Sequence, residues 1–382
     1  HPGGNQELIG TDPSGGSYTV VTPELWWPRG MGDQPLYRLT WTPDSPLLHA
    51  LHWNIGLRTI EWIREPDAWG HSFACHVNGV RVQARGANVI PADFFSVRGS
   101  ESELSRLQSA IDANMNMVRV WGGASYPGEQ FYNFCDSAGL LVWQDFMFAC
   151  AMVPGDSAYI ANVTAEAEHQ VKRLRHRASL ALWCGNNESQ KAWETWGWPD
   201  LFDLHGQDSI ATEEAYASLF HGALPSVVES ESNSFYWPSS PSRDPLAQYA
   251  EESGDEHAWR VWFDTLDFDY FSRNAGRFAS EYGLQSLPDA STLSQVGIRR
   301  FEDEALQFRQ RSKMEWLQPG LDGWGMMRIY ARRYAADPAA ADPHHTPLER
   351  WVYLTQFTQA LGLREALERD RTSDGRYAGS LY

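Results

Sequence analysis

Two glutamates, Glu188 and Glu281, follow apolar runs in a pattern that suits acid-base chemistry. The run before Glu188 reads L-A-L-W-C-G-N-N, and the run before Glu281 reads G-R-F-A-S. Cleavage of a glycosidic bond needs two facing carboxyl groups, one protonated to donate to the leaving oxygen and one ionised to attack the sugar or activate water. A single glutamate behind a strand is more often an ion-pair partner. The pair, surrounded by Trp, Asn and Tyr, favours glycoside chemistry.

The spacing of the pair indicates which elements carry it. The two residues are 93 positions apart (281 minus 188), which corresponds to about three β-α units of roughly 30 residues. In a (β/α)8 barrel this separation predicts Glu188 at the end of the fourth strand and Glu281 at the end of the seventh, where catalytic side chains stand. Polar residues also mark other strand ends: Arg119 with Trp121 on the second, and Asp145 on the third.

From about Val80 onward, apolar runs alternate with segments of helical periodicity. Runs that are apolar on both faces are typical of a parallel sheet covered by helices. Seven such runs and the start of an eighth near Leu381 predict a (β/α)8 TIM barrel of the α/β class, with its last strand apparently truncated. No G-x-G-x-x-G or Walker A sequence follows any run, which disfavours a doubly wound nucleotide-binding fold. The predicted strands cover 80–90, 117–121, 140–146, 180–188, 234–241, 257–263 and 276–283. A long segment of helical periodicity covers 322–370.

The first part of the chain follows another pattern. Short alternating runs broken by Pro and Gly, such as 18–23, 34–41 and 55–63, predict antiparallel strands of an incomplete β-sandwich. Asn78-Gly79 predicts a tight hairpin turn. We therefore expect two domains, a partial sandwich at 1–65 and a catalytic barrel at 66–382.

Composition excludes several classes of partner. The formal net charge of -18, from 49 acidic against 31 basic residues, would repel a nucleic-acid backbone. No apolar run approaches the length that crosses a membrane.

The four cysteines include no C-x-x-C pair and are interpreted as reduced, mostly buried thiols. The 18 Trp residues suit core packing, and they also suit stacking against sugar rings.

Several joined motifs resemble the β-mannosidases of glycoside hydrolase family 2. They include V-N-G-V-R-V-Q-A-R-G-A-N-V-I-P-A-D, N-M-N-M-V-R-V-W-G-G, L-L-V-W-Q-D-F-M-F-A-C-A-M-V-P, L-A-L-W-C-G-N-N-E, F-Y-W-P-S-S-P and R-F-A-S-E-Y-G. The earlier L-W-W-P-R-G-M-G-D-Q-P-L-Y and I-G-L-R-T-I resemble the end of that family's immunoglobulin-like sandwich. The resemblance extends from about residue 18 to residue 382.

The resemblance implies a retaining exo-β-mannosidase that releases terminal non-reducing β-D-mannose, without metal or cofactor. It implies that Glu188 is the acid/base, Glu281 is the nucleophile and Asn187 holds the sugar's 2-hydroxyl. Its carbohydrate substrate carries a terminal β-mannose, and neither nucleic acid nor membrane is an implied partner. The further substrate-binding residues implied are Trp121 and Trp196 as walls of the sugar pocket, with Arg119, Asp145, Tyr236 and His257.

The sequence departs from the family pattern at three places. Ala124 and Pro127 replace a glycine and an acidic residue after the second strand, which predicts a loop of different shape. The family's N-terminal jelly-roll domain is absent, and the chain stops at G-S-L-Y where the family continues. We therefore expect part of a longer protein, with an unpaired edge between the first and seventh strands.

Alternatives remain open at this stage. A related β-galactosidase or β-glucuronidase is one, and a catalytically silent sugar-binding fragment is another. His257 could equally line the site or be a hydrogen-bonded structural histidine. The tryptophans at 143, 183 and 259 are expected in the core. The cytoplasm is the expected compartment, with lysosomal or secreted alternatives because the sequence begins without Met, and the oligomeric state stays open.

Overall fold

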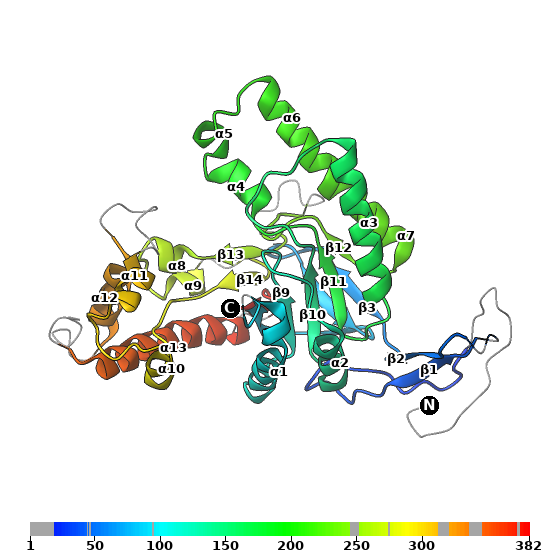
Figure 1. The fold of residues 1–382 in the computed structure, drawn as a ribbon, viewed down its shortest axis with the longest axis horizontal. Coiled ribbons are helices and arrows are strands. Elements are labelled where there is room, and N and C mark those ends of the chain that lie inside the picture. Colours follow the sequence, from blue (N-terminus) through cyan, green and yellow to red (C-terminus); the bar gives the residue numbers. More distant parts are fainter. Residues whose placement is uncertain are drawn as a thin grey trace. The chain divides into compact units, whose positions relative to one another are not determined.

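Eight strands form the main sheet of the molecule, in the order β12, β11, β10, β9, β8, β15, β14, β13 (Figure 1). Neighbouring pairs from β12 through β8 and β15 to β14 are parallel. With the helices between the strands, this order confirms the predicted (β/α)8 TIM-barrel class. The strands are β8 (Ala84–Val89), β9 (Met117–Val120), β10 (Leu141–Asp145), β11 (Leu180–Cys184), β12 (Tyr236–Trp237), β13 (Glu256–Ala258), β14 (Ala279–Tyr282) and β15 (Gly379–Leu381).

The computed structural model describes residues 19–43, 45, 47–93, 95–244, 252–273, 276–311, 321–335, 346–372 and 375–382. The chain divides into two compact units. The first extends to Glu256 and also includes 276–280 and 378–381, and the second comprises 257–275, 281–377 and Tyr382. Residues 1–18 of the predicted sandwich and 336–345 of the predicted helical segment lie outside the described residues. The predicted domain boundary at residue 65 stays a prediction.

Alternation along the strands separates two layers of the core in the first unit. In β9, Val118 and Val120 face the helices, whereas Met117 belongs to the inner cluster. A parallel strand covered on both faces needs apolar residues at successive positions, which explains the unbroken apolar runs of the sequence. The helices of this unit are α1 (Ser96–Asp112), α2 (Glu129–Ala138), α3 (Ser157–Leu174), α4 (Ser189–Thr195), α5 (Trp198–Leu201), α6 (Gln207–Tyr216), the π-helix Ala217–Ala223 and α7 (Leu224–Glu231).

Local sequence signals fix the ends of these helices. Asp156 caps α3, because its side chain accepts a hydrogen bond from the Tyr159 amide at 2.9 Å. Gly139 ends α2 in the left-handed region, with φ of 74°. None of the helices in the described part of the chain combines the length and the apolar character that a membrane crossing requires.

A small antiparallel sheet packs against the inner cluster of the main sheet. It consists of β3 (Ile60–Ile63), β6 (Ala74–Val77) and β7 (Val80–Arg81). Asn78 and Gly79 join β6 to β7 with φ of 52° and 77°, which confirms the predicted tight turn. The ring of Trp62 lies 5.8 Å from Trp143 in a T-shaped contact. The interior of the sheet is therefore filled by aromatic side chains at this end.

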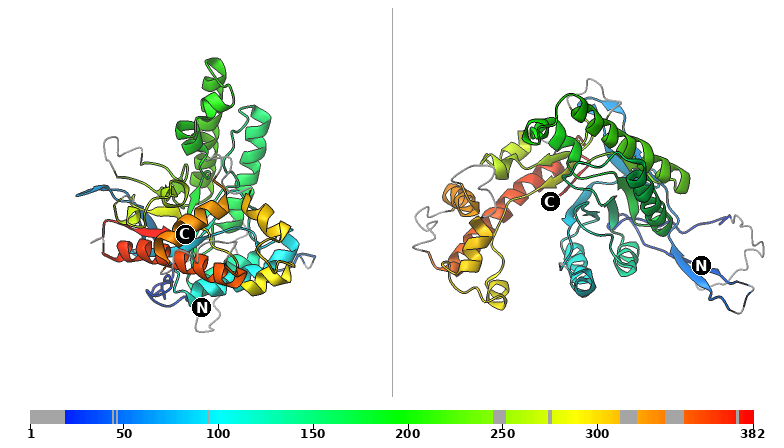
Figure 2. Two further views of the ribbon diagram at one scale, coloured as in Figure 1. Left: turned by 90° about the vertical axis from the view of Figure 1, so that its left-hand side faces the viewer. Right: turned by 45° about the horizontal axis from the view of Figure 1, so that its top comes forward.

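Two further pairs of strands precede the barrel. The hairpin of β1 (Tyr37–Trp41) and β2 (Leu51–Ile55) is antiparallel, with Tyr37 opposite Ile55, and projects away from the main sheet in Figures 1 and 2. Strands β4 (Pro66–Asp67) and β5 (Gly70–His71) form the other pair. The hairpin of β1 and β2, together with β3, fits the predicted partial sandwich, although the alternating runs identified only β1 and β3, and β4 and β5 follow the predicted boundary.

Two expectations about the later strands are wrong. β15 pairs with β8 through Ser380 opposite Arg85, and with β14 through Ser380 opposite Ala279. The expected unpaired edge between the first and seventh strands is therefore filled. The predicted strand 257–263 ends at Ala258, and α8 (Arg260–Phe263) follows it. A short apolar run fits a helix as well as a strand, so its periodicity alone does not distinguish them.

The second unit is helical. Its helices besides α8 are α9 (Tyr270–Arg273), α10 (Ala290–Gln295), α11 (Glu304–Arg311), α12 (Gly323–Tyr334) and α13 (Leu348–Thr372). α12 and α13 account for the described parts of the helical segment predicted at 322–370. Phe268 stacks on Tyr334 with ring centroids 4.1 Å apart, which forms part of this unit's own core.

Gly86 tests the packing of β8 against β9. A Cβ atom at this position would fall on the carbonyl oxygen of Met117, so Gly86→Ala should force the two strands apart and lower the midpoint of thermal unfolding. Gly99→Ala is the matched control, because Gly99 lies within α1 and its added Cβ meets only ordinary contacts. The control should be stabilised by about 1 kcal/mol. Equal midpoints for the two variants would contradict the predicted close approach.

Candidate active site

A buried ion pair lies at the carboxyl end of the central strands. Arg119 in β9 and Asp145 in β10 are both 0% exposed. The guanidinium donates from Nε to Oδ1 at 3.3 Å and from Nη2 to Oδ2 at 2.8 Å. Asp145 also accepts from Trp143 Nε1 at 2.9 Å and from the Gly122 amide at 3.0 Å. These hydrogen bonds compensate two charges that burial alone would make costly.

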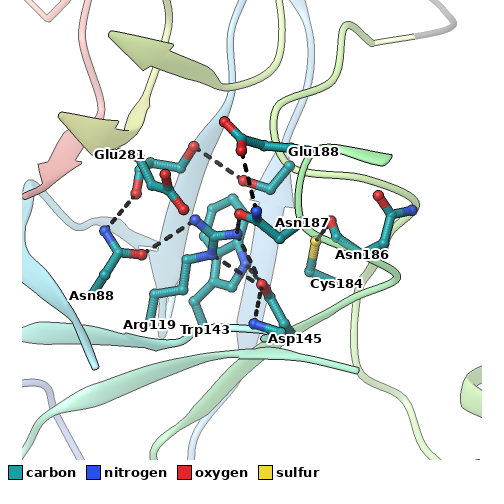
Figure 3. Close-up of polar contacts among 12 residues, drawn as sticks. Asn88, Arg119, Trp143, Asp145, Cys184, Asn186, Asn187, Glu188 and Glu281 are labelled. Atoms are coloured by element: carbon teal, nitrogen blue, oxygen red, sulfur yellow. Dashed lines mark hydrogen bonds and ion pairs between the residues drawn. The ribbon is translucent and has the colours of Figure 1, made fainter. Parts of the chain in front are cut away.

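Arg119 connects the ion pair to neighbouring strands (Figure 3). Its Nη1 donates to Asn88 Oδ1 at 3.2 Å, and its Nη2 donates to Asn187 Oδ1 at 2.9 Å. Asn88 Nδ2 in turn donates to the carbonyl oxygens of Ser280 at 3.0 Å and Leu381 at 3.2 Å. One guanidinium thus fixes side chains or backbone at the ends of several strands. Arg119 and Asp145 stay predictions as substrate-binding residues, and the hydrogen bond from Arg119 orients the Asn187 side chain.

The backbone at Glu188 has an unusual conformation. Its φ of 60° and ψ of 1° lie in the left-handed region, which is uncommon for residues other than glycine and typical of functional sites. Hydrogen bonds on both sides maintain it. The Glu188 amide donates to Ser240 O at 2.8 Å, and the Ser189 amide donates to Asn186 Oδ1 at 3.1 Å. The turn places Glu188 between β11 and α4.

Polar groups of Asn187 and Cys150 contact the Glu188 carboxylate. Asn187 Nδ2 lies 3.4 Å from Glu188 Oε2, and Cys150 Sγ lies 3.5 Å from the same oxygen. Cys150 is exposed, whereas the other three cysteines are buried as expected. Sequence reasoning missed the contact of Cys150 with Glu188, because nothing in the run A-C-A-M-V-P distinguishes this thiol from a buried one.

Glu281 has its own hydrogen-bond partners within the second unit. It lies in β14 and is 8% exposed. Trp259 Nε1 donates to Glu281 Oε2 at 2.9 Å, and His257 Nδ1 lies 3.3 Å from the same oxygen. His257 stays a prediction as a substrate-binding residue. The expectation that Trp259 is a core residue is wrong, since its ring is only partly buried and its N–H orients the carboxylate. Trp143 and Trp183, in contrast, are fully buried as predicted.

The three other predicted residues lie in different surroundings. Trp121 follows β9 and is partly buried, whereas Trp196 at the end of α4 is 44% exposed. The Tyr236 hydroxyl donates to Phe220 O at 2.7 Å. Burial raises the pKa of Tyr236 well above its ordinary value, so this hydroxyl stays protonated and remains a donor. All three stay predictions as substrate-binding residues.

Comparison with known proteins identifies the relatives of the chain. Beta-mannosidase B of Aspergillus clavatus is 35% identical over 350 residues, which are 90% of this chain and 40% of that protein. Beta-mannosidase B of Aspergillus fumigatus is 33% identical over 364 residues, 93% of this chain and 42% of that protein. The chain is related to the β-mannosidases. It spans about two fifths of the length of these relatives, and no family model matches it.

The solved structures agree with this relationship. The crystal structure of a β-D-mannosidase from Dictyoglomus thermophilum matches with a TM-score of 0.79 and 33% identity, over 94% of this chain and 42% of that one. An exo-chitosanase from Amycolatopsis orientalis matches with a TM-score of 0.58 and 16% identity, over 91% and 38% of the two chains. The second likeness concerns the fold alone. The resemblance to β-mannosidases that the sequence motifs predicted is therefore confirmed.

Removal of Asp145 tests the buried ion pair. Asp145→Ala leaves the Arg119 guanidinium buried without its carboxylate, which should cost about 3 to 5 kcal/mol of folding free energy, measured by urea denaturation. Glu168→Ala is the control, because it breaks an exposed pair with Lys172 in α3, and such pairs contribute little. A loss at Asp145 no larger than that of the control would contradict the importance of the buried pair.

Proposed function

We propose that this chain forms the catalytic part of a retaining exo-β-mannosidase that hydrolyses terminal non-reducing β-D-mannose residues from oligosaccharides or glycoconjugates. The observation that carries the proposal is that Glu188 and Glu281 stand at the carboxyl ends of two parallel strands of one sheet. Carboxyl ends of parallel strands meet at one edge of a barrel, where active sites lie. The relationship to β-mannosidases supports the choice of sugar.

In this mechanism, Glu281 attacks the anomeric carbon and the bond to the leaving oxygen breaks. Glu188 gives its proton to that oxygen, so the aglycone leaves as an alcohol and a covalent mannosyl-enzyme remains. Glu188, now a carboxylate, removes a proton from water, and the water oxygen displaces Glu281 from the sugar. Two inversions at the anomeric carbon leave mannose in the β configuration.

The surroundings of each glutamate support these roles. The Trp259 N–H and the His257 ring orient Glu281, which a nucleophile needs for in-line attack. Arg119 Nη2 donates a hydrogen bond to Asn187 Oδ1 at 2.9 Å. Because a guanidinium can only donate, the oxygen of the Asn187 amide must face it, and Nδ2 keeps a defined direction for the sugar's 2-hydroxyl. Trp121 and Trp196 would then stack on the sugar ring.

The stereochemical outcome tests the double displacement. In the complete protein, the first product from an aryl β-mannoside should be β-mannose by ¹H NMR, because two displacements restore the original configuration. The carboxyl groups of Glu188 and Glu281 should lie about 5 to 5.5 Å apart in a crystal structure, the separation typical of retaining enzymes. α-Mannose as first product would contradict the mechanism.

Variants of the acid/base test the assignment of Glu188. Glu188→Ala should slow substrates with poor leaving groups most, because an activated aryl oxide needs little protonation to depart. Azide should restore turnover of the mannosyl-enzyme, since no carboxylate then repels the anion. Glu281→Ala is the comparison variant and should lose activity on good and poor leaving groups alike. Equal losses for Glu188→Ala on both substrates, without azide rescue, would remove Glu188 from this role.

A panel of aryl β-glycosides separates the alternatives. Hydrolysis of the mannoside, with little on the galactoside or glucuronide, is the expected result. Preference for either of the other sugars would assign a related activity. Binding of mannose without hydrolysis of any member would indicate a catalytically silent sugar-binding protein.

A further inference from the structure

Asp255 is a buried carboxylate directly before β13, outside all of the roles assigned above. It is 6% exposed. Its Oδ1 accepts hydrogen bonds from Trp237 Nε1 and from the Ser242 amide, both at 2.8 Å. Its Oδ2 accepts from Ser240 Oγ at 2.6 Å and from Ser280 Oγ. Four donors therefore converge on one group that, when ionised, can only accept.

The two serines belong to the backbone that carries the two glutamates. The Ser240 carbonyl accepts from the Glu188 amide at 2.8 Å, and the Ser240 amide donates to Asn186 O at 2.9 Å. Ser280 is the residue before Glu281 in β14. The hydroxyl oxygens of the two serines are 3.1 Å apart. Asp255 is thus connected through one serine to the Glu188 turn and through the other to the strand position next to Glu281.

We infer that Asp255 is a positioning residue for the proposed glycosidase reaction, on which this inference rests. It fixes the backbone at Glu188 and at Glu281 without touching the sugar. Serine hydroxyls rotate freely unless an acceptor fixes them, and the carboxylate makes both point toward one oxygen. Because catalysis depends on sub-ångström placement of reacting groups, loss of this anchor should reduce turnover more than substrate binding.

Asp255→Asn in the complete protein tests the inference. The amide keeps the size of the side chain but replaces one acceptor oxygen by an N–H₂ donor, so the serine hydroxyls must turn around. We expect kcat to fall roughly 100-fold, the cost of a misplacement of about 1 Å, with KM within about threefold. The loss should be larger for aryl β-mannosides with poor leaving groups, because the proton donor Glu188 is displaced as well as the nucleophile Glu281.

Asp136→Asn is the matched control. Asp136 in α2 is also buried, and it accepts from the Ser179 amide at 2.8 Å and from Ser179 Oγ at 2.7 Å. These hydrogen bonds join α2 to the segment before β11. Both variants should lose stability, but at temperatures below both unfolding midpoints only Asp255→Asn should lose kcat. Equal losses of kcat in the two variants would reduce the role of Asp255 to general stability and overturn the inference.

Single serine variants keep the inference testable if Asp255→Asn does not fold. Ser240→Ala and Ser280→Ala each remove one hydroxyl, and each should lower kcat about tenfold, as expected for one hydrogen bond to a charged group. The loss in Ser240→Ala should be larger on poor leaving groups, because Glu188 supplies the proton. The loss in Ser280→Ala should be equal on both. Unchanged kcat in both serine variants would overturn the inference.

The wild-type protein separates the two proposals. If it hydrolyses none of the aryl glycosides, the proposed function is wrong, and the positioning role falls with it. If it hydrolyses the mannoside while the Asp255 and serine variants retain its kcat, only the positioning role is wrong.

Discussion

The positive charge of Arg119, held without contact with water inside a parallel sheet, constrains the whole carboxyl end of the first unit. A buried guanidinium has five N–H donors that need acceptors. Asp145, Asn88 and Asn187 supply them from three different strands or strand ends. A shift of one of these strands by one residue would exchange its inward and outward side chains and leave the charge unpaired. The register of the sheet and the direction of Asn187 are therefore parts of one constraint.

The inside of the main sheet changes character along its strands. The small sheet that includes Trp62 packs aromatic rings against Trp143 and Phe278. Beyond that layer, the inward positions are polar and hydrogen-bonded to one another. Apolar packing contributes stability without directional demands, whereas the polar layer requires each donor to find its acceptor. Rigid support on one side and directional contacts on the other are what a site needs if its side chains must be held accurately.

Periodicity and motifs predicted most of the barrel, because each strand from Ala84 to Cys184 must be apolar on both faces. They failed where the pattern is ambiguous, as in H-A-W-R-V-W-F, which contains two residues of strand and, after Trp259, a helix. The polar residues Arg119, Asp145 and Glu188 interrupt or follow apolar runs of the sequence, and this pattern identified them as candidate site residues. Asn88 interrupts an apolar strand in the same way and could have been selected by the same signal. Trp259 and Cys150 carry no such mark, since their roles arise only when distant segments meet.

The left-handed backbone at Glu188 has an evolutionary consequence. A residue with a Cβ is held there at a cost of about 1 to 3 kcal/mol, and glycine adopts the same conformation freely. Selection for stability alone would therefore favour glycine at this position, and the proposed acid/base role would account for the glutamate. In a lineage that lost the need for turnover, replacement of Glu188 by glycine would make the fold more stable while removing the proposed acid/base. A copy of this gene released from selection on activity would be expected to drift in that direction first.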